Sequence, residues 1–249
     1  MDLKIKDVAE LLNVSETTIR RWLAEGKIPA YRIHHQYRFS RMEIEDWVMS
    51  CRLKQVKGNF LPVEEEQIYP VKDEAGSVDE GTTSTVGQQQ FSLFRAIHRG
   101  DVLGHTSSTT KEGIIKETVS VIASRLGLDA AVLTDLLLDR ERLMPTALNN
   151  GIAVPHTREF LIKKPFDVMV VVYPNKSVDW GALDGKPAHT LFFLFASDDK
   201  RHLHLLAKIA HLSSDEETLK YLQSKPSKQE LLEFVKDWEA GIKSKATVS

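Results

Sequence analysis

Apolar residues recur with helical spacing in the first part of the chain. One face of a predicted first helix is formed by Ile5, Val8, Leu11 and Leu12. Ser15 follows a short polar break and can cap a second helix over residues 16–25, which Gly26 ends. Two short helices joined by a tight turn are typical of the helix-turn-helix arrangement.

The next residues predict a hairpin and a third helix. Two β-prone segments, 31–33 and 36–39, flank His34-His35, and a helix begins at Ser40 with Glu43 at capping-box spacing. Residues 1–52 therefore predict a mainly α, winged helix-turn-helix domain.

Periodicity is lost between residues 53 and 90. Prolines, glycines, an acidic run and the stretch GTTSTVGQQQ dominate there. Such a composition cannot bury enough apolar surface to offset its ordering entropy, so we interpret 53–90 as a flexible linker.

Periodic structure returns at Phe91 and alternates between helical and strand patterns. The predicted strands cover 166–173 and 189–196, and the predicted helices cover 111–126, 130–140, 200–212, 215–223 and 228–242. Three of the helices carry capping boxes, namely Thr109/Glu112, Ser214/Glu217 and Ser227/Glu230. This mixture predicts one α/β domain over 91–243, followed by a disordered tail at 244–249.

Composition narrows the class of protein. The chain has 249 residues, 42% hydrophobic and 27% charged, with a formal net charge of −2. Its single cysteine, Cys51, excludes an intrachain disulfide framework and a cysteine-rich metal site. The N-terminus lacks a signal-peptide core and the apolar runs are too short to span a bilayer, so we expect a soluble cytoplasmic protein with no membrane partner.

Positive charge is concentrated in one segment. Residues 17–41 hold six Lys or Arg and one acidic residue, Glu25, which gives 6 − 1 = +5. The charge falls on the predicted second helix and wing, where DNA phosphates would lie. A solvated basic face, or a fold reused for protein contacts, is the alternative interpretation.

The N-terminal segment resembles a known DNA-binding family. IKDVAELLNVSETTIRRWLAEGKIPAYRI, followed by YRFSRMEIEDWV, is similar to the excisionase/MerR-type winged helix-turn-helix over nearly all of residues 3–50. By position, the resemblance implies double-stranded DNA contacts from Thr17, Thr18, Arg20, Arg21, His35, Gln36 and Arg38. One such module buries little DNA surface, so we expect a homodimer or a protein partner to raise its affinity.

The segment GIAVPHTR, residues 151–158, contains the candidate nucleophile. Pro155 fixes the backbone just before His156, and a histidine at a strand end can have one ring nitrogen oriented and the other exposed. Arg140 precedes it in DRERL, and His202 and His204 begin a predicted helix. Residues two apart on a helix do not share a face, so at most one of these two histidines should reach His156.

Three ordered motifs extend this picture. RERL…NNGIAVPHTRE, VDWGALDGKPAHTLFFLFA and HLHLLAKIA resemble the IIA domains of the fructose, mannitol and nitrogen-regulatory phosphotransferase systems over about residues 92–243. The resemblance implies the IIA type-2 fold, a mixed sheet flanked by helices. It also implies a phosphohistidine at His156, an active-site arginine at Arg140 and a second active-site histidine at His202.

The same resemblance implies the partners. Phosphoenolpyruvate would be the ultimate donor, acting through Enzyme I and an HPr-like phosphocarrier that docks at an open surface around His156. No cofactor or metal is expected, since the chain has no Gly-rich phosphate loop and no HExxH or cysteine-cluster pattern.

Two positions depart from the family pattern. Thr157 replaces the usual glycine after the phosphoacceptor, and Met144-Pro145 replaces a Gly-Ser pair before Thr146. Thr157 could crowd or hydrogen-bond an incoming phosphoryl group, and Met144-Pro145 could change how Arg140 is presented.

The leading hypothesis is a phosphohistidine-carrying regulatory protein, similar to nitrogen-regulatory IIA, with a DNA-binding head. One alternative is a sugar-uptake IIA carrier that donates to a IIB protein. Another is a catalytically silent IIA-like interaction module. How the two domains communicate stays open at this stage, with dimerisation or a protein docked around His156 as routes.

Overall fold

The computed structural model describes residues 2–12, 14–33, 36–50, 91–162 and 165–246. The side chains of residues 2, 49–50 and 242–246 lie outside the description. The predicted linker over 53–90, His35 and the final residues of the predicted tail lie outside the described residues. Among the residues that are described, no helix is long and apolar enough to cross a lipid bilayer.

The N-terminal part contains the predicted helix-turn-helix and hairpin. Its elements are β1 (Asp2–Leu3), α1 (Ile5–Leu12), α2 (Glu16–Ala24), β2 (Tyr31–Ile33), β3 (Gln36–Ser40) and α3 (Arg41–Ser50). The Ser15 hydroxyl accepts a hydrogen bond from the Thr18 backbone N–H at 3.1 Å, and Gly26 ends the turn after α2 at φ +65°. The hairpin pairs β2 with β3, and β1 adds to it in the order β1-β3-β2, which the sequence had not predicted.

The C-terminal part is an α/β unit around a mixed sheet. Its elements are α5 (Ser92–Arg99), β4 (Val102–Leu103), α6 (Lys111–Leu126), α7 (Ala130–Leu143), β5 (Ile152–Ala153), β6 (Val168–Val172), β7 (Thr190–Phe195), α8 (Asp199–Leu212), α9 (Glu216–Gln223) and α10 (Lys228–Ala246). The strand order is β4-β6-β7-β5. The pairs β4–β6 and β5–β7 are parallel, and β6–β7 is antiparallel.

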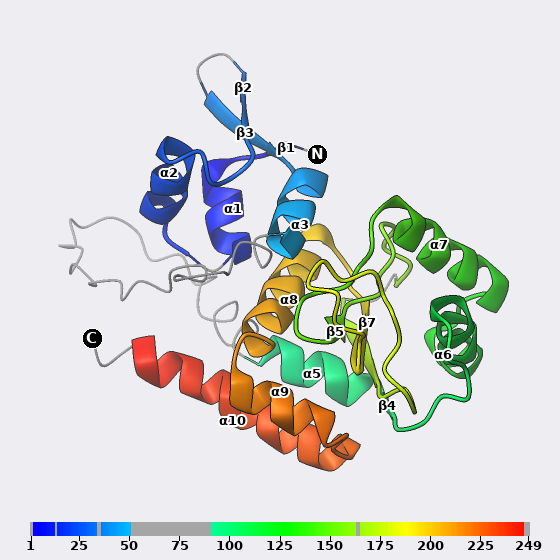
Figure 1. Ribbon diagram of the computed structural model, residues 1–249. Helices are drawn as coiled ribbons and strands as arrows, with labels where there is room; N and C mark the ends of the chain where they lie inside the picture. Colours follow the sequence, from blue (N-terminus) through cyan, green and yellow to red (C-terminus); the bar gives the residue numbers. More distant parts are fainter. Residues whose placement is uncertain (1, 13, 34–35, 51–90, 163–164, 247–249) are drawn as a thin grey trace.

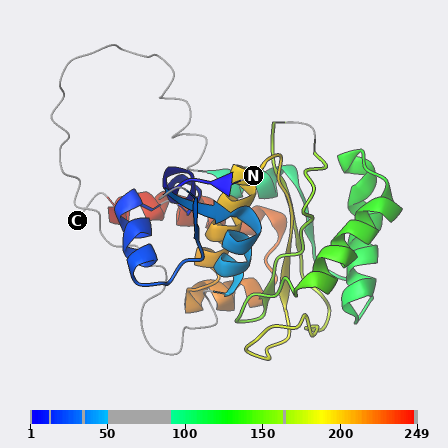
Figure 2. The ribbon, with the colours of Figure 1, turned by 90° about the horizontal axis from the view of Figure 1, so that it is seen from above.

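Strand alternation assigns the helices to two layers. Val170 and Phe193 point to the face covered by α6 and α7, whereas Met169 and Phe192 point to the face covered by α5 and α8. The two central strands are buried along their whole length because both faces are covered. Figure 2 shows α6 and α7 on one side of the sheet and the remaining helices on the other.

Several predicted helix ends were wrong by a residue or more. Thr110, not Thr109, caps α6, because its side chain accepts from Gly113 N. Asp215, not Ser214, caps α9 in the same way. Ser227 and Glu230 do form the predicted capping box. Residues 244–246 belong to α10 and not to a tail, since Gly241 does not end the helix.

The two parts are in contact. Helices α1 and α3 pack against α8, and the buried apolar residues of the helix-turn-helix part are continuous with those on the α8 side of the sheet (Figure 1). The contact brings α3 next to the end of the sheet where β5 leads into residues 154–156.

Candidate functional site

The backbone holds His156 rigidly at an end of the sheet. It follows β5, and its segment is bound on both sides, by Val154 N to Thr146 O at 2.9 Å and by Leu194 N to Pro155 O at 2.9 Å. The ring Nδ1 lies 2.7 Å from Val154 O, which can only accept, so Nδ1 carries a proton. The other ring nitrogen, Nε2, therefore faces the interior of the site.

Arg140 lies against that second nitrogen. It is in the last turn of α7 and is 2% exposed, with Nε 3.1 Å from His156 Nε2. Its Nη1 donates to Met144 O at 3.0 Å, an anchor that leaves Nε and Nη2 directed into the site. Met144, one of the two departures from the family pattern, thus positions Arg140 through its backbone carbonyl.

His202 completes the group that the sequence predicted. It is in the first turn of α8, which Asp198 caps, and its ring centroid lies 4.8 Å from that of His156 in an edge-to-face arrangement. Its Nε2 is buried without a hydrogen-bond partner among the described residues. Burial, followed by the charge of His156, lowers the pKa of His202 well below its ordinary value, so the ring is neutral at pH 7.

A fourth residue, Glu45, enters the site from α3 and was not predicted. Its Oε1 lies 2.7 Å from His156 Nε2 and 3.0 Å from Arg140 Nη2, and its Oε2 lies 3.6 Å from His202 Nε2. Burial by itself raises the pKa of Glu45, but the hydrogen bond and charge of His156, with the charge of Arg140, hold that pKa far below its usual range. The carboxylate is therefore ionised and buried.

Glu45 carries no local signal that could have revealed this role. It is separated from Arg140 by 95 residues and from His156 by 111. In the sequence it is one of several acidic residues on an amphipathic helix, a pattern that ordinarily marks a solvated face.

The expectation that His156 opens onto the surface is wrong for this conformation. His156 is 1% exposed, because α3 covers the site and inserts Glu45 between the three predicted residues. No second protein can reach Nε2 while α3 is in this position.

Thr157, the other departure from the family pattern, does not point at His156 Nε2. It is buried, and its hydroxyl donates to Glu159 O at 2.8 Å. The hydroxyl is thereby engaged within its own loop.

Glu45, His156 and His202 could together offer ligands to a metal ion. Their ligand atoms lie within 4.8 Å of one another. Arg140 Nη2 contacts the same Glu45 oxygen at 3.0 Å, however, so a divalent cation would lie beside a permanently charged guanidinium. This charge arrangement favours an anion over a cation.

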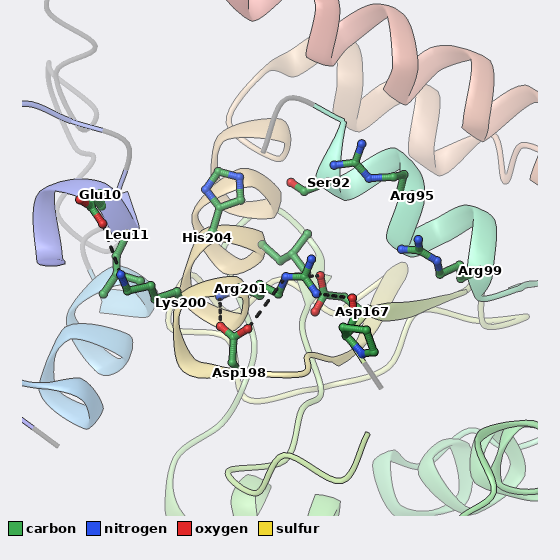
Figure 3. Close-up of a pocket in the computed structure, with 12 residues that line it drawn as sticks. Glu10, Leu11, Ser92, Arg95, Arg99, Asp167, Asp198, Lys200, Arg201 and His204 are labelled. Atoms are coloured by element: carbon green, nitrogen blue, oxygen red, sulfur yellow. Dashed lines mark hydrogen bonds and ion pairs between the residues drawn. The ribbon is translucent and has the colours of Figure 1, made fainter. Parts of the chain in front are cut away.

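His204 lies outside the site, as the spacing argument predicted. It lines a groove of about 430 Å³ between α1, α5 and α8, together with Glu10, Arg95 and Lys200 (Figure 3). Neither Arg140, His156 nor His202 lines this groove, so it is separate from the site around His156.

The predicted DNA-contact residues differ in their exposure. Thr17, Arg20 and Gln36 are exposed, and Arg21 and Arg38 are partly exposed. Arg38 Nη2 donates to Gln36 Oε1 at 2.7 Å, so these two side chains act as a pair on β3. Figures 1 and 2 show α2 on the side of this part that faces away from the α/β unit.

Thr18 does not fit its predicted role. It is 9% exposed, and its hydroxyl lies 3.0 Å from Ser15 Oγ. Thr18 belongs to the cap of α2 because the first turn of the helix folds its side chain back onto Ser15. It does not present that side chain on the basic surface.

Relatives of this chain share the α/β part. This chain is 30% identical over 152 residues to a nitrogen regulatory protein of Pseudomonas aeruginosa, and the match covers 60% of this chain and 97% of the relative. It is 32% identical over 135 residues to a nitrogen regulatory protein of Klebsiella oxytoca, and the match covers 52% of this chain and 80% of the relative. The fructose-specific EIIABC component of Bacillus subtilis matches at 30% over 132 residues, covering 51% of this chain and 20% of the relative.

Solved structures show the same fold. The nitrogen regulatory protein IIA-Ntr of Neisseria meningitidis superposes with a TM-score of 0.50 at 23% identity, covering 57% of this chain and 94% of that one. A phosphotransferase IIA domain of Streptococcus pyogenes superposes with a TM-score of 0.50 at 21% identity, and the match covers 58% of this chain and 95% of that one.

Family matches account for both parts of the chain. Residues 3–52 match the family described as a helix-turn-helix domain. Residues 97–238, more than half of the chain, match the family described as phosphoenolpyruvate-dependent sugar phosphotransferase system, EIIA 2. This chain therefore belongs to the EIIA type-2 family of the phosphotransferase system and carries a helix-turn-helix domain at its N-terminal end.

Proposed function

We propose that this protein is a phosphohistidine-carrying regulatory member of the phosphotransferase system, related to nitrogen-regulatory IIA, with a DNA-binding head. The observation that carries the proposal is the convergence of His156, Arg140 and His202. The Nδ1 of His156 is bound to a backbone carbonyl, and its Nε2 faces a guanidinium and a second imidazole.

Phosphoryl transfer follows from this geometry once Nε2 is accessible. With the proton on Nδ1, Nε2 has a lone pair that attacks phosphorus in line. The N–P bond to Nε2 forms as the bond from phosphorus to the nitrogen of an HPr-like carrier breaks, and the carrier's imidazole leaves. Val154 O keeps the Nδ1 proton in place throughout.

The surrounding side chains serve the transition state. Negative charge is then spread over the equatorial phosphoryl oxygens, and the Nε and Nη2 groups of Arg140 are oriented toward that volume. A neutral His202 can donate a hydrogen bond to the same oxygens from Nε2, which has no partner in the described structure.

The helix-turn-helix domain supports binding to double-stranded DNA. Arg20 and Gln36 are exposed on α2 and β3, and the net charge of residues 17–41 is positive. In such domains the second helix enters the major groove and its side chains reach base edges. A homodimer or a protein partner would supply the area that one module lacks.

The test is intact-mass analysis after incubation with phosphoenolpyruvate, Enzyme I and an HPr-type carrier. We expect one acid-labile phosphoryl adduct on the wild type and none on His156→Ala. The Glu45→Ala chain is tested in parallel, so that a covered site is not mistaken for an inert one. No adduct on Glu45→Ala, with the carrier itself phosphorylated, would support a silent interaction module, and onward transfer to a IIB protein would support sugar uptake.

A further inference from the structure

The site around His156 is filled by an anion from another domain of the same chain. Glu45 is 3% exposed and is the residue of α3 that lies between His156 and Arg140. Its two oxygens face three groups that carry or can carry N–H donors, which are Arg140, His156 and His202. The occupant of the site is therefore a planar anion held by cationic and imidazole groups.

The same donors are the ones that a phosphoryl group on His156 would need. A phosphoryl group attached to Nε2 would place its oxygens within reach of Arg140 Nε and Nη2, where Glu45 Oε1 now lies at 3.3 and 3.0 Å. Two anions cannot share this volume, because they would overlap sterically and repel each other in a buried environment. Occupation by Glu45 and by phosphate is mutually exclusive.

Glu45 also blocks the approach to the nucleophilic nitrogen. Its Oε1 lies 2.7 Å from His156 Nε2, and Arg140 Nε lies 3.1 Å from the same atom. A phosphorus atom that approaches Nε2 in line would need the volume that the carboxylate fills. His156 therefore cannot attack phosphorus while Glu45 is bound.

We propose that Glu45 is an internal surrogate for the phosphoryl group. In the docked state α3 blocks transfer to His156, and phosphorylation of His156 in turn displaces α3 and releases the helix-turn-helix domain. The displacement of α3 by phosphorylation rests on the proposed function. The docking of Glu45 does not, since it requires no phosphoryl donor.

The rest of the interface suits a reversible contact. Arg41 Nη1 lies 2.8 Å from Asp199 Oδ1, and its guanidinium lies over the Phe160 ring at 4.6 Å. Lys200 and Glu10 form an ion pair at 3.4 Å whose side chains are 63% and 46% exposed. The exposed Lys200–Glu10 pair contributes little and is screened by salt, whereas the Arg41–Asp199 pair is partly buried. Glu45 is the most buried acid of the interface and meets three side chains, so its loss should matter most.

Docking does not cover α2. Figures 1 and 2 place α2 away from the α/β unit, whereas α1 and α3 face α8. Phosphorylation would therefore change the position of the DNA-binding domain relative to the IIA domain without uncovering its second helix. By linkage, whatever stabilises the released domain also favours phosphorylation of His156.

The experiment compares the full-length wild type with Glu45→Ala, Glu45→Gln and a matched control, Glu43→Gln, which changes an exposed acid on the same helix. Small-angle X-ray scattering measures the radius of gyration without any phosphoryl donor, both in the presence and in the absence of EDTA. Intact mass then follows phosphorylation over time with the HPr-type carrier and, separately, with phosphoramidate. In the latter case the P–N bond breaks, ammonia leaves and the bond from phosphorus to Nε2 forms.

We expect Glu45→Ala and Glu45→Gln to have a larger radius than the wild type, and Glu43→Gln to match the wild type. If about 90% of the wild type is docked, both Glu45 variants should accept phosphate roughly tenfold faster. The phosphorylated wild type should have the larger radius as well.

Each contrary result would overturn one part of the proposal. Equal radii for the wild type and both Glu45 variants would refute docking through Glu45. Separation of the wild-type domains by EDTA alone would replace the carboxylate contact by a bridging metal ion. A phosphorylated wild type that stays compact would refute the displacement. Expanded Glu45 variants that accept phosphate from neither donor would refute the proposed function while leaving the docking contact supported.

Discussion

At the scale of single residues, the site depends on how polar atoms are shared between backbone and side chains. His156 uses Nδ1 for a backbone carbonyl, and Arg140 uses Nη1 for another, so each side chain has one end fixed and the other free to act. The fixed ends come from residues within four positions in the sequence, which is why local motifs could predict them. The free ends meet only because α7, β5 and α8 converge.

The role of Arg140 can be tested by a change that keeps its charge. Arg140→Lys retains a cation but loses the planar fork that contacts Met144 O and the site together. In a Glu45→Ala background, where docking is absent, we expect phosphoryl transfer to slow by about 10²-fold. The rate is measured by intact mass with the HPr-type carrier.

Arg142→Lys is the matched control, because Arg142 lies on the same helix and is paired with Asp139 on the exposed surface. We expect its rate to equal that of the Glu45→Ala parent. Equal rates for both arginine variants would show that Arg140 does not act on the transferring group.

His202 makes stability depend on pH. Its pKa is lowered in the folded chain from the ordinary value of 6.5, so below pH 6.5 the unfolded chain binds a proton that the native residue does not. The free energy of unfolding should therefore fall by about 1.4 kcal/mol per pH unit below 6.5 on account of this residue, and be unaffected by it above that pH. Urea unfolding at pH 7.5, 6.5 and 5.5 measures the slope.

We expect His202→Asn to flatten this slope between pH 6.5 and 5.5. His98→Asn, a change on the exposed side of α5, should leave the slope as in the wild type. The same slope in all three proteins would mean that His202 does not remain neutral in the folded chain.

At the scale of elements, patterning predicted the helices and strands better than their ends. The apolar periods of α6, α8 and the two central strands were long enough to be unambiguous. Capping depends instead on one side chain and one backbone N–H, and adjacent Ser, Thr and Asp residues compete for that position. Thr109 and Thr110 are both exposed, and only the fold decided which of them reaches Gly113 N.

The cap of α6 gives a direct test of that correction. Thr110→Ala removes the acceptor for Gly113 N, so we expect it to lower the free energy of unfolding by about 1 kcal/mol. Thr109→Ala, one residue earlier, should cost much less. Thermal or urea unfolding of the two variants measures the difference, and a larger cost for Thr109→Ala would restore the cap that the sequence first suggested.

At the scale of the whole molecule, the basic segment and the site around His156 lie on different elements. Helix α2 lies on the side of its domain away from the α/β unit, while the anion site around His156 is occupied by Glu45 of α3. In the proposed docked state, α2 is therefore not covered by the α/β unit. The net charge of −2 for the whole chain does not reveal the local positive charge of residues 17–41.

DNA binding through α2 can be tested by its salt dependence. Arg20 is exposed and paired only loosely with Glu16, at 3.5 Å. If Arg20 neutralises one phosphate, Arg20→Ala should reduce the slope of log K against log salt by about 1 and weaken binding to duplexes of any sequence. Fluorescence anisotropy with a labelled duplex at several salt concentrations gives the slope.

Lys116→Ala is the control, since Lys116 is exposed on α6 in the other domain. It carries the same change in net charge as Arg20→Ala. Parallel slopes for the wild type and both variants would place the DNA contacts elsewhere.

The amino-acid sequence by itself determined both folds and three of the residues in the site. Helical and strand periods are local, and the ordered motifs around Arg140, His156 and His202 all lie within one domain. The burial of Thr18 was not predicted, because position in a motif does not say whether a side chain folds back onto its own cap.

Only the tertiary structure decided the position of Glu45 and the covering of His156. A buried carboxylate is stable there because the Arg140 guanidinium donates to it and the His156 ring lies against it, from positions 95 and 111 residues further along the chain. Nothing in the local pattern of α3 distinguishes Glu45 from an exposed acid, because its burial depends on which surface the helix meets. That surface exists only after α8 and the end of the sheet have folded together.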